Sequence, residues 1–168
     1  MHIFIVGPMA SGKSTIGKKL AKTLGVDFID IDKEIERKAG VEISRIFEME
    51  GEEGFREREK KTLKELSGGN NSVISTGGGA VLRIENRELM KSKGKVIYLE
   101  TPVELQLERT LKDKSRPLLS KGNKEETLRS LKKQRDPLYQ EIANITIKQN
   151  NKNYYQILKE IIKNLNVN

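Results

Sequence analysis

The sequence of 168 residues contains no cysteine and no tryptophan, and it has a single histidine. Without cysteine the chain can form no disulfide, no thiolate nucleophile and no cysteine metal site. The one histidine, His2, stands beside the start of the first apolar run, and we interpret it as a surface or strand-end residue. A histidine-based triad and a multi-histidine metal site are excluded, so acid–base chemistry must fall to Asp, Glu, Lys or Tyr.

Long apolar runs are also missing, since none approaches the ~20 residues needed to span a bilayer. The apolar start at residues 1–6 is short and lacks a basic leader, so we expect a buried strand there and no signal peptide. We therefore expect the protein to be cytoplasmic and to have no membrane partner. A length of 168 residues suits one compact domain, residues 1–168, that buries a core without disulfide or metal staples.

Basic residues exceed acidic ones, 32 against 24, and give a net charge of +8. Such an excess is compatible with nucleic-acid binding. The lysines are spread along helical stretches, however, and we find no aromatic-rich RNA-binding motif. We favour a solvated surface with a site for anions such as phosphate and carboxylate, and we expect a monomer with no nucleic-acid partner.

Strand-length apolar runs alternate with helical stretches along the chain. Strands are predicted at 3–6, 28–31, 72–76, 96–99 and 145–148. Helices are predicted at 13–24, 35–67 with interruptions near Gly40 and Gly51, 85–92, 103–111, 125–139 and 154–165. This alternation predicts an α/β fold with a parallel sheet and helices on both faces. The runs are rich in Ile and Val, as expected for strands buried on both faces.

The first strand leads into residues 7–14, which match the phosphate-binding pattern G-x-x-x-x-G-K-[ST], the P-loop. Glycine lets the backbone wrap closely around phosphate, and the following helix adds its positive N-terminal end. Lys13 supplies an ammonium for the outer phosphates, and the hydroxyl of Ser14 can bind Mg²⁺. The candidate nucleotide-binding residues here are Gly7, Ala10, Ser11, Gly12, Lys13, Ser14 and Thr15.

Two aspartates follow at the end of the second predicted strand. Period-two alternation places Asp30 and Asp32 on one face, at the strand end where parallel sheets bind ligands. A carboxylate there can bind Mg²⁺ through water or accept a proton from an attacking hydroxyl. Asp32 is also a plausible helix N-cap. After a P-loop we prefer the functional interpretation.

Further motifs allow both an ordinary and a functional interpretation. Arg56 and Glu59 share a helical face, where they can form an ordinary surface ion pair or where Glu59 can hold Arg56 in a functional position. Three glycines at 77–79 leave a strand, either as a loose turn or to bring bare backbone close to another group. Arg135, near the end of a helical pattern, can cap carbonyls or bind an anion. The polar segment 112–124 is either an idle loop or a lid.

Taken together, these motifs resemble the shikimate kinases, which belong to the nucleoside-monophosphate-kinase-like P-loop group. The resemblance extends from Ile3 to about Tyr155. Beyond the P-loop, it rests on Asp-Ile-Asp at 30–32, Phe55-Arg56 with Glu59, the glycines at 77–79, Arg-Pro-Leu-Leu at 116–119, and Arg135 before Pro-Leu-Tyr at 137–139. It implies a five-stranded parallel sheet in the order 2-3-1-4-5, a substrate-binding helical region at about 33–61 and a mobile lid at about 112–124.

The resemblance also implies the reaction and the roles of residues. ATP would phosphorylate the 3-hydroxyl of shikimate, with Mg²⁺ as cofactor, in aromatic amino acid biosynthesis. Ser14 and Asp30 would bind the metal ion, and Arg109 would lie by the adenine. Lys13, Asp32 and Arg116 would be catalytic, with Arg116 reaching the phosphates from the lid. Shikimate would be bound by Asp32, Arg56, Gly77, Gly78, Gly79 and Arg135. One departure is Tyr154, where many members of the family have proline against the adenine.

The residues themselves agree with this substrate. Shikimate has a carboxylate, which suits two arginine forks, and hydroxyls, which suit Asp32. Phosphoryl transfer depends on positioning and charge neutralisation, so the lack of a catalytic histidine is no obstacle. A gluconate kinase would also need carboxylate binding and remains a rival, whereas a nucleotide kinase needs a base-reading pocket that we do not find. A P-loop nucleic-acid-binding or regulatory protein is the rival from another class.

Overall fold

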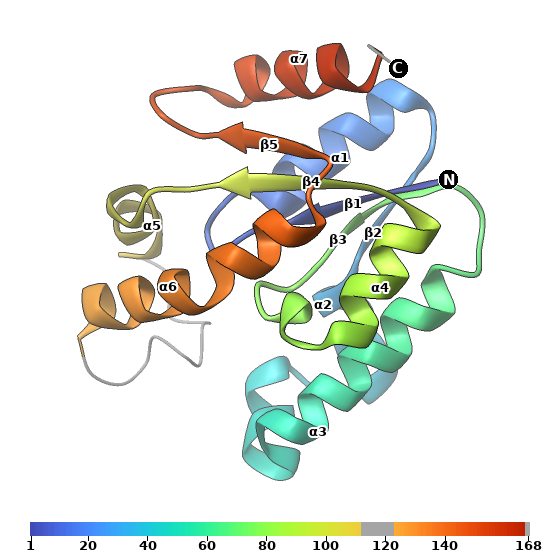
Figure 1. The fold of residues 1–168 in the computed structure, drawn as a ribbon. Coiled ribbons are helices and arrows are strands. Elements are labelled where there is room, and N and C mark those ends of the chain that lie inside the picture. The colour runs from blue at the N-terminus through green and yellow to red at the C-terminus, as the bar shows by residue number, and fades with distance from the viewer. Residues whose placement is uncertain (112–122, 167–168) are drawn as a thin grey trace.

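The computed structural model describes residues 1–111 and 123–166. Its five strands are β1 (His2–Val6), β2 (Asp27–Asp30), β3 (Ser72–Ser75), β4 (Gly94–Glu100) and β5 (Ile145–Lys148). They form one parallel sheet in the order β2-β3-β1-β4-β5, drawn in Figure 1. The α/β class and the strand order are both confirmed.

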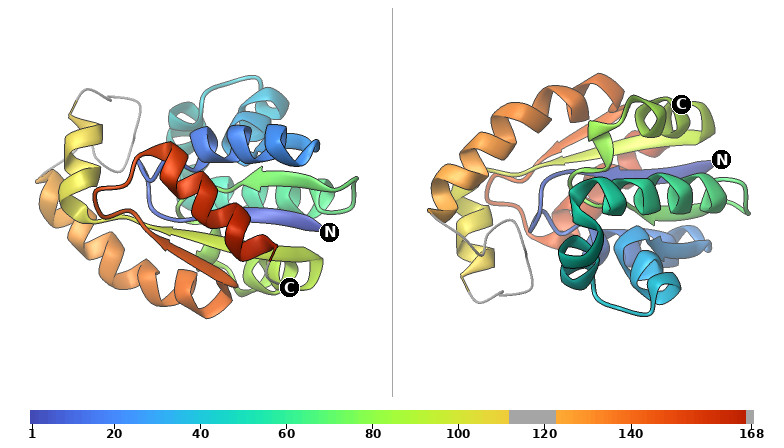
Figure 2. Two further views of the ribbon diagram at one scale, coloured as in Figure 1. Left: turned by 90° about the horizontal axis from the view of Figure 1, so that it is seen from above. Right: turned by 90° about the horizontal axis from the view of Figure 1, so that it is seen from below.

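Helices lie on both faces of this sheet. They are α1 (Lys13–Leu24), α2 (Ile31–Ala39), α3 (Ile43–Leu66), the 3₁₀ turn η1 (Ala80–Leu82), α4 (Ile84–Lys93), α5 (Val103–Thr110), α6 (Lys124–Ile142) and α7 (Tyr154–Leu165). Helices α1 and α7 cover one face, and α3, α4 and α6 lie on the other, as the two views of Figure 2 show. The connections into α1, α2 and α5 leave the carboxyl ends of β1, β2 and β4, so these loops gather at one edge of the sheet.

Each face of the sheet has its own apolar core. Phe4 and Val6 point to the face of α3, α4 and α6 and pack with Phe55 and Tyr139. Ile5, between them in sequence, points to the opposite face, because successive strand side chains alternate. There it joins the core that α1 and α7 cover, with Ile16, Leu20, Ile157 and Ile161. The central strand is therefore buried on both faces, as its unbroken apolar run predicts.

The second strand ends one residue earlier than predicted. The Asp30 side chain accepts a hydrogen bond from the Lys33 amide, 3.2 Å away, and so caps α2, which begins at Ile31. Both interpretations of Asp32 from alternation and capping are therefore wrong: it lies neither on a strand face nor at the N-cap, but in the first turn of α2. The expected helix interruptions are confirmed at Gly40, which ends α2, and at Gly51, where α3 kinks.

The structure also bears on the expectations for Arg135, His2, a membrane span and the lid. Helix α6 runs on to Ile142 with Pro137 inside it, so Arg135 lies within the helix and not near its end. His2 is a strand-end residue but not a surface one, since it is buried with its Nδ1 3.0 Å from the Ser72 hydroxyl. Among the described helices none is long and apolar enough to cross a membrane. The proposed lid, apart from residues 123 and 124, lies outside the described residues.

Candidate active site

The P-loop follows β1 and adopts a backbone that demands glycine at two positions. Gly7 has φ of 150° and Gly12 has φ of 82°, values that side chains rarely allow. A Cβ on Gly7 would also lie 2.9 Å from the Leu99 carbonyl oxygen. Gly12 is the N-cap of α1 and offers no side-chain cap, so the first amides of this helix open onto the loop. This is the arrangement that binds phosphate oxygens.

Polar side chains from α1 and β2 meet at the loop. The Lys13 ammonium donates hydrogen bonds to the carbonyls of Gly7 and Pro8, at 2.9 and 2.8 Å, and so lies across the loop. The Ser14 hydroxyl donates to an Asp30 carboxylate oxygen 2.6 Å away. Ser14 and Asp30 are thus brought together as predicted, and they offer the oxygen ligands that Mg²⁺ prefers. Thr15 follows them on an exposed position of α1.

Helix α3 contributes a buried ion pair. The Arg56 guanidinium donates to a Glu59 carboxylate oxygen at 2.9 Å. Only 7% of Arg56 and 1% of Glu59 is exposed, so the interpretation as a surface ion pair is wrong. Glu59 holds Arg56 in position, as its place three residues along the helix predicts.

The three glycines at 77–79 pass directly against these charges. A Cβ on Gly77 would lie 2.9 Å from an oxygen of Asp32 and 2.9 Å from an oxygen of Glu59. A Cβ on Gly79 would collide with the Arg56 guanidinium. Gly78 lies against the P-loop, because its Cβ would be 3.5 Å from the Met9 amide nitrogen. The segment is therefore no loose turn, but bare backbone that joins the charged cluster to the P-loop.

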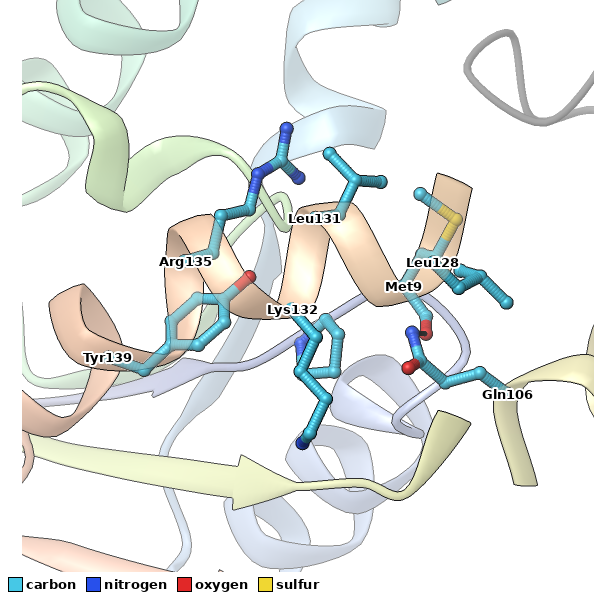
Figure 3. A pocket seen from close by; sticks show the side chains of 8 residues that line it. Met9, Gln106, Leu128, Leu131, Lys132, Arg135 and Tyr139 are labelled. Carbon is cyan, nitrogen blue, oxygen red and sulfur yellow. Dashed lines mark hydrogen bonds between the residues drawn. The ribbon is translucent and has the colours of Figure 1, made fainter. Parts of the chain in front are cut away.

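Arg135 reaches the same place from α6. A Cβ on Gly78 would lie 3.5 Å from its Nη1 atom, and the Tyr139 hydroxyl donates to the Gly78 carbonyl at 2.5 Å. Figure 3 shows Arg135, Lys132 and Tyr139 projecting from α6 around a pocket that Met9 and Gln106 also line. Arg135 is only 5% exposed. Its interpretation as a cap of helix carbonyls is wrong, because it lies one turn or more inside α6.

Several buried atoms of this cluster have no hydrogen-bond partner among the described residues. They are Asp32 Oδ1, Arg56 Nε, Glu59 Oε2 and Arg135 Nε. An unpaired buried polar group costs about 1–3 kcal/mol, so folded proteins seldom keep several in one place without a use for them. Two arginines and two carboxyls that converge from α2, α3 and α6 suit a small ligand with both a carboxylate and hydroxyls.

Burial changes the acidity of these groups. It raises the pKa of Glu59 to about 7, with the neighbouring Arg56 guanidinium acting in the opposite direction. Burial also raises the pKa of Asp32, and the negative charge of Asp30 adds to this, while Lys13 and Arg56 oppose it. The pKa of Arg135 is lowered by burial. Arginine stays charged all the same at neutral pH, so the cluster keeps both positive charges.

The structure also brings in residues that the sequence analysis did not select. Tyr98 donates to Asp136 at 2.6 Å and stacks on Tyr139 with ring centroids 5.0 Å apart, which supports the Tyr139 contact to Gly78. The Pro-Leu-Tyr motif at 137–139 gives no sign in the sequence that its tyrosine hydroxyl contacts the glycine loop. Gln149, which the sequence analysis also did not select, donates from its side-chain amide to the Ser11 carbonyl of the P-loop.

Arg109 lies beside the P-loop, where it donates to the Ala10 carbonyl at 2.8 Å. Its guanidinium carbon is 5.8 Å from the centroid of the Tyr154 ring, which also flanks Gly12. The residue at which the chain departs from the family pattern is thus next to the P-loop. Arg116, the remaining candidate, lies outside the described residues.

Comparison with known proteins agrees with this geometry. The family model for shikimate kinase matches residues 9–166. The chain belongs to the shikimate kinase family. A shikimate kinase of Actinobacillus pleuropneumoniae serotype 5b (strain L20) is 51% identical over 162 residues, which cover 96% of this chain and 94% of that protein.

Solved structures give the same family. A shikimate kinase from Acinetobacter baumannii in complex with shikimate matches with a TM-score of 0.95 and 51% identity, covering 98% of this chain and 92% of that one. A gluconokinase from Sinorhizobium meliloti 1021 matches with a TM-score of 0.60 and 15% identity, covering 98% of this chain and 90% of that one. This second likeness extends to the fold alone.

Proposed function

We propose that this chain transfers the γ-phosphoryl group of ATP to the 3-hydroxyl of shikimate, giving shikimate 3-phosphate and ADP. The observation that carries the proposal is the cluster against the P-loop of three buried residues, Arg56, Glu59 and Arg135, with Asp32, whose Oδ1 atom is buried. Membership of the shikimate kinase family supports the same substrate. A general phosphate-binding protein would have no need for two buried arginines beside its P-loop.

In this proposal the two arginines clamp the substrate carboxylate. Both guanidinium groups are buried and each has an Nε without a hydrogen-bond partner among the described residues. A guanidinium binds a carboxylate through two parallel hydrogen bonds, so Arg56 and Arg135 together can fix both its position and its plane. Glu59 keeps Arg56 in place by accepting a hydrogen bond from its guanidinium. The backbone of Gly77, Gly78 and Gly79 forms the floor of the substrate site.

Asp32 would receive the attacking hydroxyl. Its Oδ1 atom, which has no hydrogen-bond partner among the described residues, lies beside Gly77, and the pKa of Asp32 is raised mainly by burial. A carboxylate there can orient the hydroxyl and accept its proton as the phosphoryl group is transferred. Because the transition state of phosphoryl transfer is loose, this positioning matters more than the strength of the base.

The phosphates of ATP would bind at residues 7–15. The amides of Gly7, Ala10, Ser11, Gly12 and Thr15 and the side chains of Lys13 and Ser14 are the proposed ligands. Lys13 now lies on the carbonyls of Gly7 and Pro8, and we expect its ammonium to turn to the phosphates when ATP binds. Arg109 would contact the adenine. Arg116 is proposed from the sequence to contact the phosphates.

Ser14 and Asp30 would hold Mg²⁺, the proposed cofactor. Their oxygens are 2.6 Å apart, and within the described part of the chain no three Asp, Glu, His or Cys residues gather as metal ligands. This suits an ion that keeps several waters and binds through few protein oxygens together with substrate phosphates. When bound, such an ion neutralises charge on the phosphates.

The remaining expectations extend the proposal. They are a monomer in the cytoplasm without a nucleic-acid partner, and one domain at 1–168 with a substrate-binding region at about 33–61 and a lid at about 112–124. Size-exclusion chromatography with light scattering tests the monomer. Retention on DNA or RNA at moderate salt would favour the rival nucleic-acid-binding function.

A coupled assay of ADP release tests the activity directly. The purified chain is supplied with ATP and Mg²⁺ and with shikimate, gluconate or nucleoside monophosphates in turn. We expect ADP release when shikimate is the acceptor and none with gluconate or nucleoside monophosphates. Phosphorus NMR of the product should identify a phosphate monoester on the 3-hydroxyl of shikimate. ADP release with gluconate and not with shikimate would overturn the proposed substrate while leaving the P-loop assignment intact.

A further inference from the structure

Gln149 is a buried amide at the edge of the P-loop. It directly follows β5, and its backbone N–H donates to the Glu100 carbonyl at 3.0 Å, which continues the pairing of β5 with β4. The residue is 1% exposed. Figure 1 shows β5 beside β4, with α5 following β4 at the same end of the sheet. A long polar side chain is therefore buried where three elements meet.

Its side-chain amide is fully used. The Nε2 atom donates to the Ser11 carbonyl at 2.6 Å and to the Thr101 hydroxyl oxygen at 3.0 Å. The Oε1 atom accepts from both terminal nitrogens of Arg109, each at 3.3 Å. One side chain thus connects the P-loop, the end of β4 and the last turn of α5. An amide is suited to this position because it carries two donors and an acceptor without a net charge.

The hydrogen bond to the Ser11 carbonyl determines the orientation of the peptide group that joins Ser11 and Gly12. A trans peptide is planar, with its C=O and the following N–H pointing in opposite directions. Among the described residues no peptide bond is cis, so holding the Ser11 carbonyl toward Gln149 turns the Gly12 N–H the other way. Gly12 is the N-cap of α1, and the first amides of this helix face the loop, where phosphate is proposed to bind.

The bond to Arg109 acts on the neighbouring peptide group. Arg109 donates from Nη1 to the Ala10 carbonyl at 2.8 Å, and Ala10 has φ of 59°, which is unusual for a residue with a side chain. Since Gln149 accepts from both Nη1 and Nη2, it fixes the guanidinium in its plane beside the Tyr154 ring. Two successive carbonyls of the loop, those of Ala10 and Ser11, thus depend on one glutamine.

We propose that Gln149 is a positioning residue for nucleotide: it orients the Gly12 amide and the Arg109 side chain, and through them it sets the affinity for ATP. This inference rests on the proposed function, in which the P-loop binds ATP. Within the described part of the chain, the Gln149 side chain hydrogen-bonds to Ser11, Thr101 and Arg109, none of which is proposed to bind shikimate, so the affinity for shikimate should not depend on it.

Isothermal titration calorimetry on the purified full chain, with ATP and with shikimate, tests the proposal. Gln149→Leu keeps the volume and removes all four hydrogen bonds. Gln149→Asn keeps the amide but shortens it, so that it cannot reach Ser11 and Arg109 together. We expect each variant to raise the Kd for ATP by about five- to thirtyfold, as for the loss of one or two hydrogen bonds. The Kd for shikimate should change by less than about twofold, as for an independent site.

Ser72→Ala is the matched control. It removes a buried hydrogen bond, to His2, at the opposite end of the strands from the P-loop. This variant should lower the melting temperature without changing the Kd for ATP. Gln149 is a structural residue only if Gln149→Asn lowers the melting temperature as the control does and keeps the wild-type Kd for ATP. The same conclusion follows if this variant loses affinity for ATP and for shikimate equally. Wild-type protein that fails to bind ATP would instead overturn the proposed function itself, and this inference with it.

Discussion

Asp32 and Glu59 approach the same glycine from two different helices. A Cβ on Gly77 would lie 2.9 Å from an oxygen of each carboxyl, and both of those oxygens are buried without a hydrogen-bond partner among the described residues. Asp32 comes from the first turn of α2 and Glu59 from the middle of α3. Two acidic groups and a bare backbone thus share one small space beside the buried guanidinium of Arg56.

The first prediction concerns the size of that space. Gly77→Ala places a methyl group against both carboxyls, so either Asp32 or Glu59 must shift. We expect kcat/KM for shikimate to fall at least about tenfold, because small displacements of positioned groups are costly in catalysis. Steady-state kinetics measure this. Gly68→Ala, where the new Cβ would meet nothing closer than 3.4 Å, is the control and should retain wild-type kinetics.

The second prediction is a pH dependence of stability due to Glu59. Its pKa is raised by burial from 4.5 to about 7, so between these values the folded protein binds more protons at this site than the unfolded chain. The contribution of Glu59 to stability is therefore complete below about pH 4.5 and is lost as the pH rises toward 7. Glu59→Gln, which stays neutral, should gain stability relative to wild type over this interval.

Urea unfolding at several pH values between 5 and 8 measures the Glu59 effect. Glu65→Gln is the comparison, because the hydrogen bond from Lys38 lowers the pKa of the exposed Glu65 and its contribution changes only in more acidic solution. A difference between Glu59→Gln and wild type that stays constant with pH would show that Glu59 does not titrate here.

The third prediction is that the Lys13 ammonium neutralises charge on the transferred phosphoryl group. Lys13→Ala should reduce kcat by about a hundredfold or more, the order lost when one preorganised charge contact is removed. The fold should survive, since Lys13 donates to the loop carbonyls of Gly7 and Pro8 and belongs to neither apolar core. Circular dichroism checks the fold, and Lys22→Ala, an exposed position in the last turn of α1, is the control. Near-normal turnover in folded Lys13→Ala protein would refute the assignment.

The fourth prediction separates the two aspartates. Asp32→Asn keeps the shape but removes the charge and the basicity, so we expect a severe loss of kcat with ATP affinity retained. Asp30→Asn should instead raise the Mg²⁺ concentration needed for half-maximal activity, because Asp30, which accepts a hydrogen bond from Ser14 at the loop, is a proposed ligand of the ion. Calorimetry with ATP and with shikimate distinguishes the roles. If Asp32→Asn loses ATP binding and keeps shikimate binding, the two residues have exchanged functions.

The fifth prediction tests the carboxylate clamp. Arg56→Lys and Arg135→Lys each keep a positive charge but lose the planar fork that binds a carboxylate with two hydrogen bonds. Each should raise the KM for shikimate more than the KM for ATP. Arg58→Lys, which pairs with Glu50 on the exposed side of α3, is the control and should leave both constants unchanged. Unchanged shikimate affinity in both of the buried-site variants would contradict the clamp.

Local patterns in the sequence were enough to predict most of the fold. The unbroken apolar runs predicted strands buried on both faces, and β5 and α7 were predicted with their observed bounds. Errors occurred where one hydrogen bond determines a boundary, as at Asp30, whose cap starts α2 before Asp32. They also occurred at Arg135, because α6 continues to Ile142, beyond residue 139 where the helical pattern was expected to end.

By itself the sequence determined the chemistry available to this protein: a P-loop, no cysteine, no histidine pair, and aspartates and arginines in a spacing typical of one family. These features depend on residue type and short-range order, which a linear chain states directly. Only the tertiary structure decided that Arg56 and Glu59 form a buried pair, that Gly77 lies between two carboxyls, and that Gln149 holds the P-loop from 138 residues away. Burial and long-range contacts arise from the packing of distant segments, so no local pattern in the sequence can specify them.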